Sequence, residues 1–286
     1  MQVQVQVQGA RLLSVLALAL AVPLCQGDLQ RDREILSLLY NTTGGPNWFD
    51  NDGWGESDLS LWYGVTFNET SSLVEKVYLR QNNLRGEIPA ELGELSGCLE
   101  VDLQGNFLTG AIPPELGNLK ELELLALEEN LLTGTIPVEL TKPEKLEKIW
   151  LDANDLEGEI PEEFGNQTGI SVIHFGGNRL TGEIPVSLGN LLDMQYLFLE
   201  DNLLTGSIPE EIGQLVVRGS LGGALHLQNN YLTGTVPGDI PDPDPDVELT
   251  AWMFDVDLSG NMLDNWPDQR DETATAPPQT SSTADS

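Results

Sequence analysis

The chain has 286 residues, with 13 lysines and arginines against 46 aspartates and glutamates, so its formal net charge is −33. This charge excludes the usual binders of DNA and RNA, which neutralise phosphates with clustered basic side chains, and it disfavours docking on anionic lipid. Hydrophobic residues make up 40% of the chain, which is enough for a packed core.

Residues 1–27 are predicted to be a secretory signal peptide. Arg11 precedes a short apolar run, and Cys25 and Gly27 are small residues at the −3 and −1 positions of a cleavage site. The run is short for a bilayer span, which disfavours the alternative of an uncleaved anchor. We therefore expect a secreted, extracellular protein. Its N-glycosylation sequons lie at Asn41, Asn68 and Asn166.

Cysteine usage predicts a fold without an internal disulfide. Once the signal peptide is removed, Cys98 is the single cysteine. It occupies an apolar position of the repeats described below, which favours a buried free thiol over a bridge to another chain.

Residues 28–73 are predicted to form an N-terminal capping region. Apolar residues at helical spacing predict a helix over residues 30–40. Trp48, Trp54 and Trp62 follow it. Packing of these aromatic side chains against each other is favoured over the alternative, a platform for sugar rings.

Residues 74–265 contain an internal repeat. Six asparagines from Asn82 to Asn202 recur at one constant spacing, and Asn230 and Asn261 follow at slightly longer intervals. A glycine lies four residues after each of the first seven asparagines, and a proline lies seven after. Two apolar residues precede each asparagine at fixed spacing. This period is typical of a solenoid, in which neighbouring repeats stack to close one core.

Each repeat predicts a short strand with a buried asparagine behind it. The apolar-x-apolar pair places alternate side chains in the core. The asparagine amide is expected to satisfy backbone groups of the adjacent repeat, which makes its burial tolerable. The glycine permits a backbone conformation that a Cβ atom would penalise.

The Asn-x-Leu-x-Gly-x-Ile-Pro pattern resembles the leucine-rich repeat family in its plant-type form. The resemblance covers residues 74–265 and implies an α/β solenoid of about eight 24-residue repeats with a concave parallel β-sheet. The run Trp62-Tyr63-Gly64-Val65 is similar to the N-terminal cap of such proteins. The cysteines usual around that run are replaced by Ser60 and Phe67, so the cap is expected to depend on its tryptophans.

Residues 266–286 are predicted to be a disordered tail, because they are rich in Pro, Thr, Ser and acidic residues. They contain no hydrophobic stretch for a membrane span or a glycolipid anchor. Upstream, Asp242, Asp244 and Asp246 alternate with prolines. A solvated acidic insertion is favoured there over a calcium loop, since the glycine of the sharp turn is missing.

Sequence motifs for catalysis are absent. The chain has no phosphate-binding glycine-rich loop, no His-Glu-x-x-His and no Cys-x-x-Cys. We therefore expect no catalytic residues, no cofactor and no metal site. His174 and His226 lie two repeats apart without a third ligand, which favours stacking or interface roles for them.

The solenoid geometry predicts which side chains face the concave surface. Residues four and six positions before each asparagine point away from the core. They form an aromatic and imidazole stripe, and acidic residues form a border beside it. The candidate binding residues of the stripe are Tyr78, Trp150, His174, Tyr196, Phe198 and His226, and those of the border are Glu128, Asp152, Glu200 and Asp201.

These features predict a secreted, non-catalytic recognition protein that binds an extracellular protein or peptide with a basic patch through its concave face. The resemblance implies the same, as in leucine-rich repeat ectodomains and secreted inhibitors of pectin-degrading enzymes. Alternative functions are a module that binds cell-wall or matrix polysaccharide, a glycosidase inhibitor, and an enzyme that acts through a carboxylate pair. An ice-surface coat is a further alternative, for which the concave columns are too mixed. The aromatic stripe could also serve only to stabilise the sheet by stacking.

Overall fold

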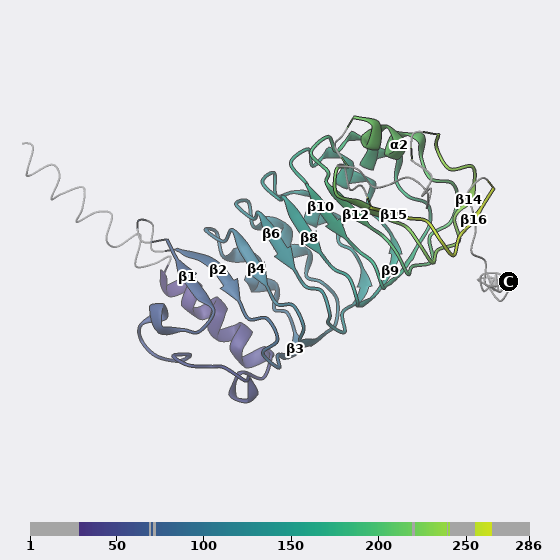
Figure 1. Cartoon of the computed structure of the whole chain (residues 1–286). Helices are drawn as coiled ribbons and strands as arrows, with labels where there is room; N and C mark the ends of the chain where they lie inside the picture. Colours follow the sequence, from purple (N-terminus) through teal and green to yellow (C-terminus); the bar gives the residue numbers. More distant parts are fainter. Residues whose placement is uncertain are drawn as a thin grey trace, which may run out of the picture.

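The computed structural model describes residues 29–68, 70, 73–218, 221–238, 240 and 255–264. The predicted signal peptide, the predicted tail and the acidic Asp-Pro insertion lie outside the described residues. In Figure 1 the repeats lie side by side in a curved stack, which begins at the N-terminal cap and ends at the yellow strands β15 and β16.

A nine-stranded sheet lines the inner side of the stack within the described residues. Its strands follow the repeats in chain order, and every pair is parallel except β1 and β2. In spatial order they are β1 (Val65–Phe67), β2 (Val74–Tyr78), β4 (Glu100–Asp102), β6 (Leu124–Ala126), β8 (Lys148–Trp150), β10 (Val172–His174), β12 (Tyr196–Phe198), β13 (Ala224–His226) and β15 (Asp255–Asp257).

The register of this sheet repeats the spacing of the sequence. Ile149 lies between Leu125 and Ile173, the equivalent residues of the repeats before and after it, and all three side chains are buried. The next apolar position of each repeat, such as Leu151, is buried as well. The predicted alternation of buried and outward-facing side chains is therefore confirmed, because a strand points successive side chains to opposite faces.

A second row of short strands, which the sequence analysis did not predict, follows the asparagines. These strands pair in parallel as β3 with β5, as β9 with β7 on one side and β11 on the other, and as β14 with β16. The glycine of each repeat lies here with a positive φ, for example 80° at Gly158 and 79° at Gly182, which L-residues with a Cβ rarely adopt. Their bounds are β3 (Arg85–Glu87), β5 (Phe107–Thr109), β7 (Thr133–Thr135), β9 (Asp155–Glu159), β11 (Arg179–Thr181), β14 (Thr233–Gly234) and β16 (Met262–Leu263).

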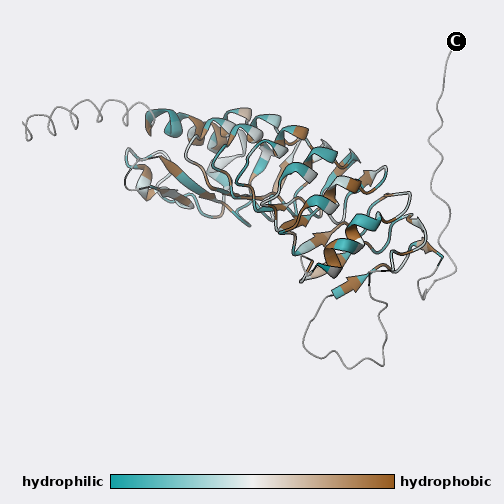
Figure 2. Ribbon diagram, turned by 90° about the horizontal axis from the view of Figure 1, so that it is seen from above, coloured by the Kyte–Doolittle hydropathy of each residue, from teal (hydrophilic) through white to brown (hydrophobic). Residues whose placement is uncertain are grey.

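The outer side of the stack is mostly 3₁₀-helical, where an α/β repeat was expected. Each 3₁₀ segment begins directly after the repeat proline and has too few residues for more than one or two turns. The repeat between Asn202 and Asn230 is longer than those before it, and it alone among the described repeats contains an α-helix, α2 (Glu210–Val217). Figure 2 shows these outer segments stacked beside one another. They are η3 (Ala90–Glu94), η4 (Pro114–Asn118), η5 (Val138–Thr141), η6 (Glu162–Asn166) and η7 (Val186–Asn190).

The buried asparagines connect each repeat to the one before it, as predicted. Asn154 Oδ1 accepts a hydrogen bond of 3.0 Å from Leu132 N, and its Nδ2 donates to the carbonyls of Leu127, Leu151 and Asp152. The same pattern recurs at Asn130, Asn178, Asn202 and Asn230. These amides satisfy backbone groups that would otherwise be buried without a partner.

Aromatic packing closes the N-terminal end. The described part of the first helix covers residues 29–42, and η1 (Gly45–Asn47) and η2 (Leu59–Leu61) follow. Trp48 and Trp62 are buried, and Trp54 contacts both of their rings. Packing is therefore the role of these tryptophans. Cys98 is buried and free, and burial raises the pKa of its thiol to about 12.

Candidate functional site

Four of the predicted stripe residues lie in lateral register on neighbouring strands of the concave sheet. Trp150, His174, Phe198 and His226 occupy the same position of β8, β10, β12 and β13. The Phe198 ring lies 4.8 Å from each imidazole, measured between ring centroids. Tyr196 joins the stripe from the start of β12, at 5.9 Å from Phe198. The concave face therefore holds an aromatic cluster, in which His174, Tyr196, Phe198 and His226 are in ring contact and Trp150 is a neighbour of His174 in register.

Most of this cluster is half-buried, where an exposed row was expected. Tyr196 is 38% exposed, whereas Trp150, His174, Phe198 and His226 are each of intermediate exposure. The inner curve of the solenoid brings side chains of adjacent strands into contact, so neighbouring rings cover each other's faces. The curvature of the solenoid cannot be predicted from the sequence pattern, so the burial of these rings was not expected.

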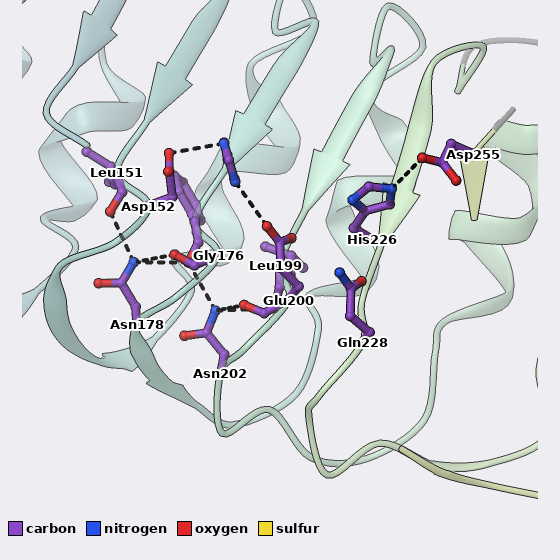
Figure 3. Close-up of polar contacts among 12 residues, drawn as sticks. Leu151, Asp152, Gly176, Asn178, Leu199, Glu200, Asn202, His226, Gln228 and Asp255 are labelled. Atoms are coloured by element: carbon purple, nitrogen blue, oxygen red, sulfur yellow. Dashed lines mark hydrogen bonds and ion pairs between the residues drawn. The ribbon is translucent and has the colours of Figure 1, made fainter. Parts of the chain in front are cut away.

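His174 lies between two carboxylates from the predicted acidic border. Its Nδ1 is 3.0 Å from Asp152 Oδ1, and its Nε2 is 3.1 Å from Glu200 Oε1. Figure 3 marks both contacts with dashed lines at Asp152 and Glu200. Burial by itself disfavours the imidazolium, but the hydrogen bond that His174 donates to Glu200 and the charges of both carboxylates outweigh it and raise the pKa of His174.

Gly176 leaves the room that the side chain of Glu200 needs to contact His174. It occupies the position equivalent to Asp152 in the next repeat, and a Cβ atom there would lie 2.5 Å from Glu200 Oε1. The carboxylate of Glu200 thus fills the space that a side chain at residue 176 would take. The one signal of this role in the sequence is that Gly176 interrupts an otherwise polar column.

Glu128 is buried, which corrects its predicted place on an open acidic border. Only 7% of the residue is exposed, and its Oε2 has no hydrogen-bond partner among the described residues. Burial raises the pKa of Glu128 to about 7. A hydrogen bond from its own backbone N–H lowers the pKa, whereas the charges of Asp152 and Asp102 raise it further. Burial likewise raises the pKa of Asp152, which the charge of His174 only partly opposes.

The remaining predicted residues lie apart from the carboxylates around His174. Asp201 is exposed in a turn with a φ of 52° and accepts a hydrogen bond from Asn229. His226 contacts Asp255 rather than the central carboxylates, as Figure 3 shows. Tyr78 lies at the N-terminal end of the sheet, where its hydroxyl donates to Glu100.

Ion pairs that the sequence analysis missed neutralise the N-terminal part of the concave face. Lys76 lies 2.6 Å from Glu100 Oε1, and Arg80 Nε lies 3.0 Å from the buried carboxylate of Asp102. The signal was present in the sequence, because Lys76 and Glu100 are one full repeat apart and therefore occupy one column. This part of the face is balanced in charge.

The sequons lie away from the central strands. Asn41 is exposed at the end of the first helix, and Asn166 is exposed at the end of η6 on the outer side. Asn68 is half-buried beside β1, where its amide donates to Glu75. Glycans at these positions would leave the cluster around His174 accessible.

Within the described ranges, no three histidine, cysteine, aspartate or glutamate side chains converge as a metal site would require. Over the same residues, no helix is long and apolar enough to cross a membrane.

Comparison with known proteins agrees with this geometry. The Leucine Rich Repeat family model matches residues 99–119, 145–167, 169–191 and 193–215. The chain is built from plant-type leucine-rich repeats. No curated protein sequence matches it.

The structural neighbours of these leucine-rich repeats include plant receptor ectodomains. The plant peptide hormone receptor RGFR1 in complex with RGF2 is 38% identical, with a TM-score of 0.59, over 65% of this chain and 28% of that one. The Arabidopsis thaliana receptor kinase GASSHO1/SCHENGEN3 ectodomain, in complex with CASPARIAN STRIP INTEGRITY FACTOR 2, is 30% identical with a TM-score of 0.68, over 81% of this chain and 30% of that one. The chain thus spans less than a third of either structure.

A plant ice-binding protein shares the fold. It is 22% identical, with a TM-score of 0.52, over 82% of this chain and 87% of that one. This likeness concerns the fold alone.

Proposed function

We propose that the chain is a secreted, non-catalytic recognition protein that binds an extracellular peptide or protein on its concave face. The observation that carries this proposal is the half-buried aromatic cluster of Trp150, His174, Phe198 and His226, set in register on a rigid parallel sheet. Aromatic side chains of this kind are the usual anchors of protein interfaces, and a preformed surface lowers the ordering cost of binding.

Three further observations support the proposal. Receptors with similar solenoids were solved with peptide hormones bound. The sequons Asn41 and Asn166 lie outside the concave sheet. The chain carries 46 acidic side chains against 13 basic ones, which suits a partner with a basic patch.

The test is capture of the partner by an immobilised chain with and without the aromatic cluster. We expect Trp150→Ala with Phe198→Ala to abolish retention of the secreted protein or peptide that the wild type retains, while the circular dichroism spectrum stays unchanged. A matched control is Phe107→Ala with Leu131→Ala, which removes exposed apolar side chains outside the concave sheet and should retain the partner. Undiminished capture by the first variant would contradict the proposal.

Salt provides a second measurement. If acidic side chains steer a basic partner, raising the ionic strength about tenfold should slow association while dissociation changes little, since screening acts on long-range attraction. Association rates that are independent of salt would remove the basic patch from the proposal.

Binding of a neutral glycan is the second candidate. One observation favours it: an open hollow beside Tyr196, lined by Ser171, Asp193, Gln195 and the backbone of Gly222 and Gly223. An exposed aromatic face with polar groups around it suits a sugar ring. Retention on a panel of neutral and acidic glycans, lost in Tyr196→Ala, would favour this candidate.

A further inference from the structure

We propose that Glu128, Asp152 and the ring of Trp150 form a site for a guanidinium group, which an arginine side chain of the peptide or protein partner would supply. We call these three residues the arginine notch. The inference rests on the proposed function and deepens it, because it names the chemistry that the central repeats recognise.

The first observation is a set of buried carboxylate oxygens without donors. Glu128 Oε2, Asp152 Oδ1 and Glu200 Oε2 are each buried, and none has a hydrogen-bond partner among the described residues. Asp152 Oδ1 contacts His174 Nδ1 at 3.0 Å, but without hydrogen-bond geometry. Buried carboxylates of this kind are costly unless a cation pairs with them. The concave face therefore has an unsatisfied demand for positive charge.

The protein's own cations form no ion pair with Glu128 among the described residues. Arg80 pairs with Asp102, and its charge acts on Glu128 from a longer range, while Lys76 pairs with Glu100. His174 contacts Asp152 and Glu200, but no ion pair among the described residues joins it to Glu128. Burial next to the charges of Asp152 and Asp102 keeps the pKa of Glu128 at about 7, so a further cation would stabilise its charged form.

The register of the strands fits a planar, forked donor. Glu128 and Asp152 follow β6 and β8 at equivalent positions, and Glu129 N donates to Asp152 O between the two backbones. Neighbouring strands lie about 4.8 Å apart. Two carboxylates at that spacing suit the N–H groups of one guanidinium, whereas an ammonium ion acts as a point charge.

The surroundings of Trp150 complete the notch. Trp150 precedes Asp152 by two residues and therefore faces the same side of its strand. Its neighbour in register on β6 is Ala126, a small residue that is itself fully buried. No ring–ring contact within the described residues involves Trp150, in contrast to His174, Phe198 and His226. An indole face is the preferred partner of a stacked guanidinium.

The test uses the histidine signals as reporters in the intact chain. The protein has two histidines, so its NMR spectrum contains two imidazole Cε1–H resonances, which the His226→Gln variant assigns. The probe is N-acetyl-arginine amide, and its neutral isostere N-acetyl-citrulline amide is the matched control ligand. A bound guanidinium adds positive charge to the carboxylate cluster that holds His174, so we expect the arginine probe to shift the His174 resonance and to lower the pKa of His174.

We expect the citrulline probe to leave the His174 signal in place and the arginine probe to leave the His226 signal in place. Glu128→Gln should weaken the binding of the arginine probe by about tenfold, which is the effect of losing one charge-assisted hydrogen bond. Glu163→Gln removes an exposed carboxylate of the outer side and should bind as the wild type does. Melting curves of both variants show whether they are folded.

Equal shifts from arginine and citrulline, or unchanged binding in a folded Glu128→Gln variant, would overturn the arginine notch. Neither result touches the proposed function, because partner capture by the aromatic cluster is measured separately through Trp150→Ala with Phe198→Ala. Conversely, arginine binding together with undiminished partner capture by that double variant would contradict the proposed function and would also remove the Trp150 ring from the arginine notch.

Discussion

The concave face has two regions that treat the same kind of side chain differently. In the N-terminal region, the acidic residues Glu100 and Asp102 are paired with Lys76 and Arg80 from the preceding repeat. In the central region, Asp152 and Glu200 share His174, and Glu128 has no ion pair among the described residues. Both regions are built on the same parallel strands, so the difference lies in which repeats place a basic residue beside an acidic one. We expect the neutralised region to serve stability, and we propose that the uncompensated region serves recognition.

The largest effect on stability is expected from a substitution that breaks an ion pair of the neutralised N-terminal region. Arg80→Ala would leave the carboxylate of Asp102, which is 1% exposed, without its cation. We expect a loss of about 3 kcal/mol in the free energy of unfolding, because an uncompensated buried charge is left behind. Urea unfolding measures it. Adding Asp102→Asn to this variant should restore most of the loss, and a single Arg80→Ala variant as stable as the wild type would contradict the assignment.

A smaller effect is expected from the asparagine ladder, which lies behind both regions. Asn154→Ala removes four hydrogen bonds and leaves buried backbone groups such as Leu132 N unsatisfied. The expected cost is about 1–3 kcal/mol. Since the ladder is common to all repeats, Asn106→Ala in the N-terminal region should cost a similar amount. Equal melting temperatures of wild type and Asn154→Ala would show that the ladder adds no stability.

The smallest effect is expected in the central region, where a substitution should raise the free energy of unfolding rather than lower it. The pKa of Glu128 is raised from 4.5 to about 7 on folding, so its stabilising contribution is complete below pH 4.5 and is lost as the pH rises through 7. Glutamine does not ionise. Glu128→Gln should therefore be more stable than the wild type at pH 8, by about 1–2 kcal/mol, and equally stable near pH 4.5.

Urea unfolding at the two pH values measures this difference. Glu163→Gln, which changes an exposed carboxylate, is the control and should show no such dependence on pH. A Glu128→Gln variant that is less stable than the wild type at pH 8 would show that the buried carboxylate is already compensated within the fold.

Much of the scaffold could be predicted from the sequence because its signals are local and periodic. The constant repeat length placed Ile149 between Leu125 and Ile173, and it placed Trp150, His174 and Phe198 in one row. The buried asparagine amides followed from the need to satisfy backbone groups. The longer repeat after Asn202 was visible too, although its α-helix α2 was not inferred from it.

The burial and the contacts of the acidic side chains at the site depend on side-chain packing, which the spacing of residues in the sequence does not predict. Glu128 and Asp201 were assigned to one acidic border, yet Glu128 is buried and Asp201 is exposed in a turn with positive φ. Glu200 reaches His174 because Gly176 leaves room between two repeats.

By itself, then, the amino-acid order determined the stack of repeats, the row of aromatic side chains and the excess of acid. Only the tertiary structure decided which carboxylates are paired and which are buried without a cation. The physical reason is that charge compensation and burial act across strands, between side chains from different repeats, and depend on the curvature that brings those side chains together.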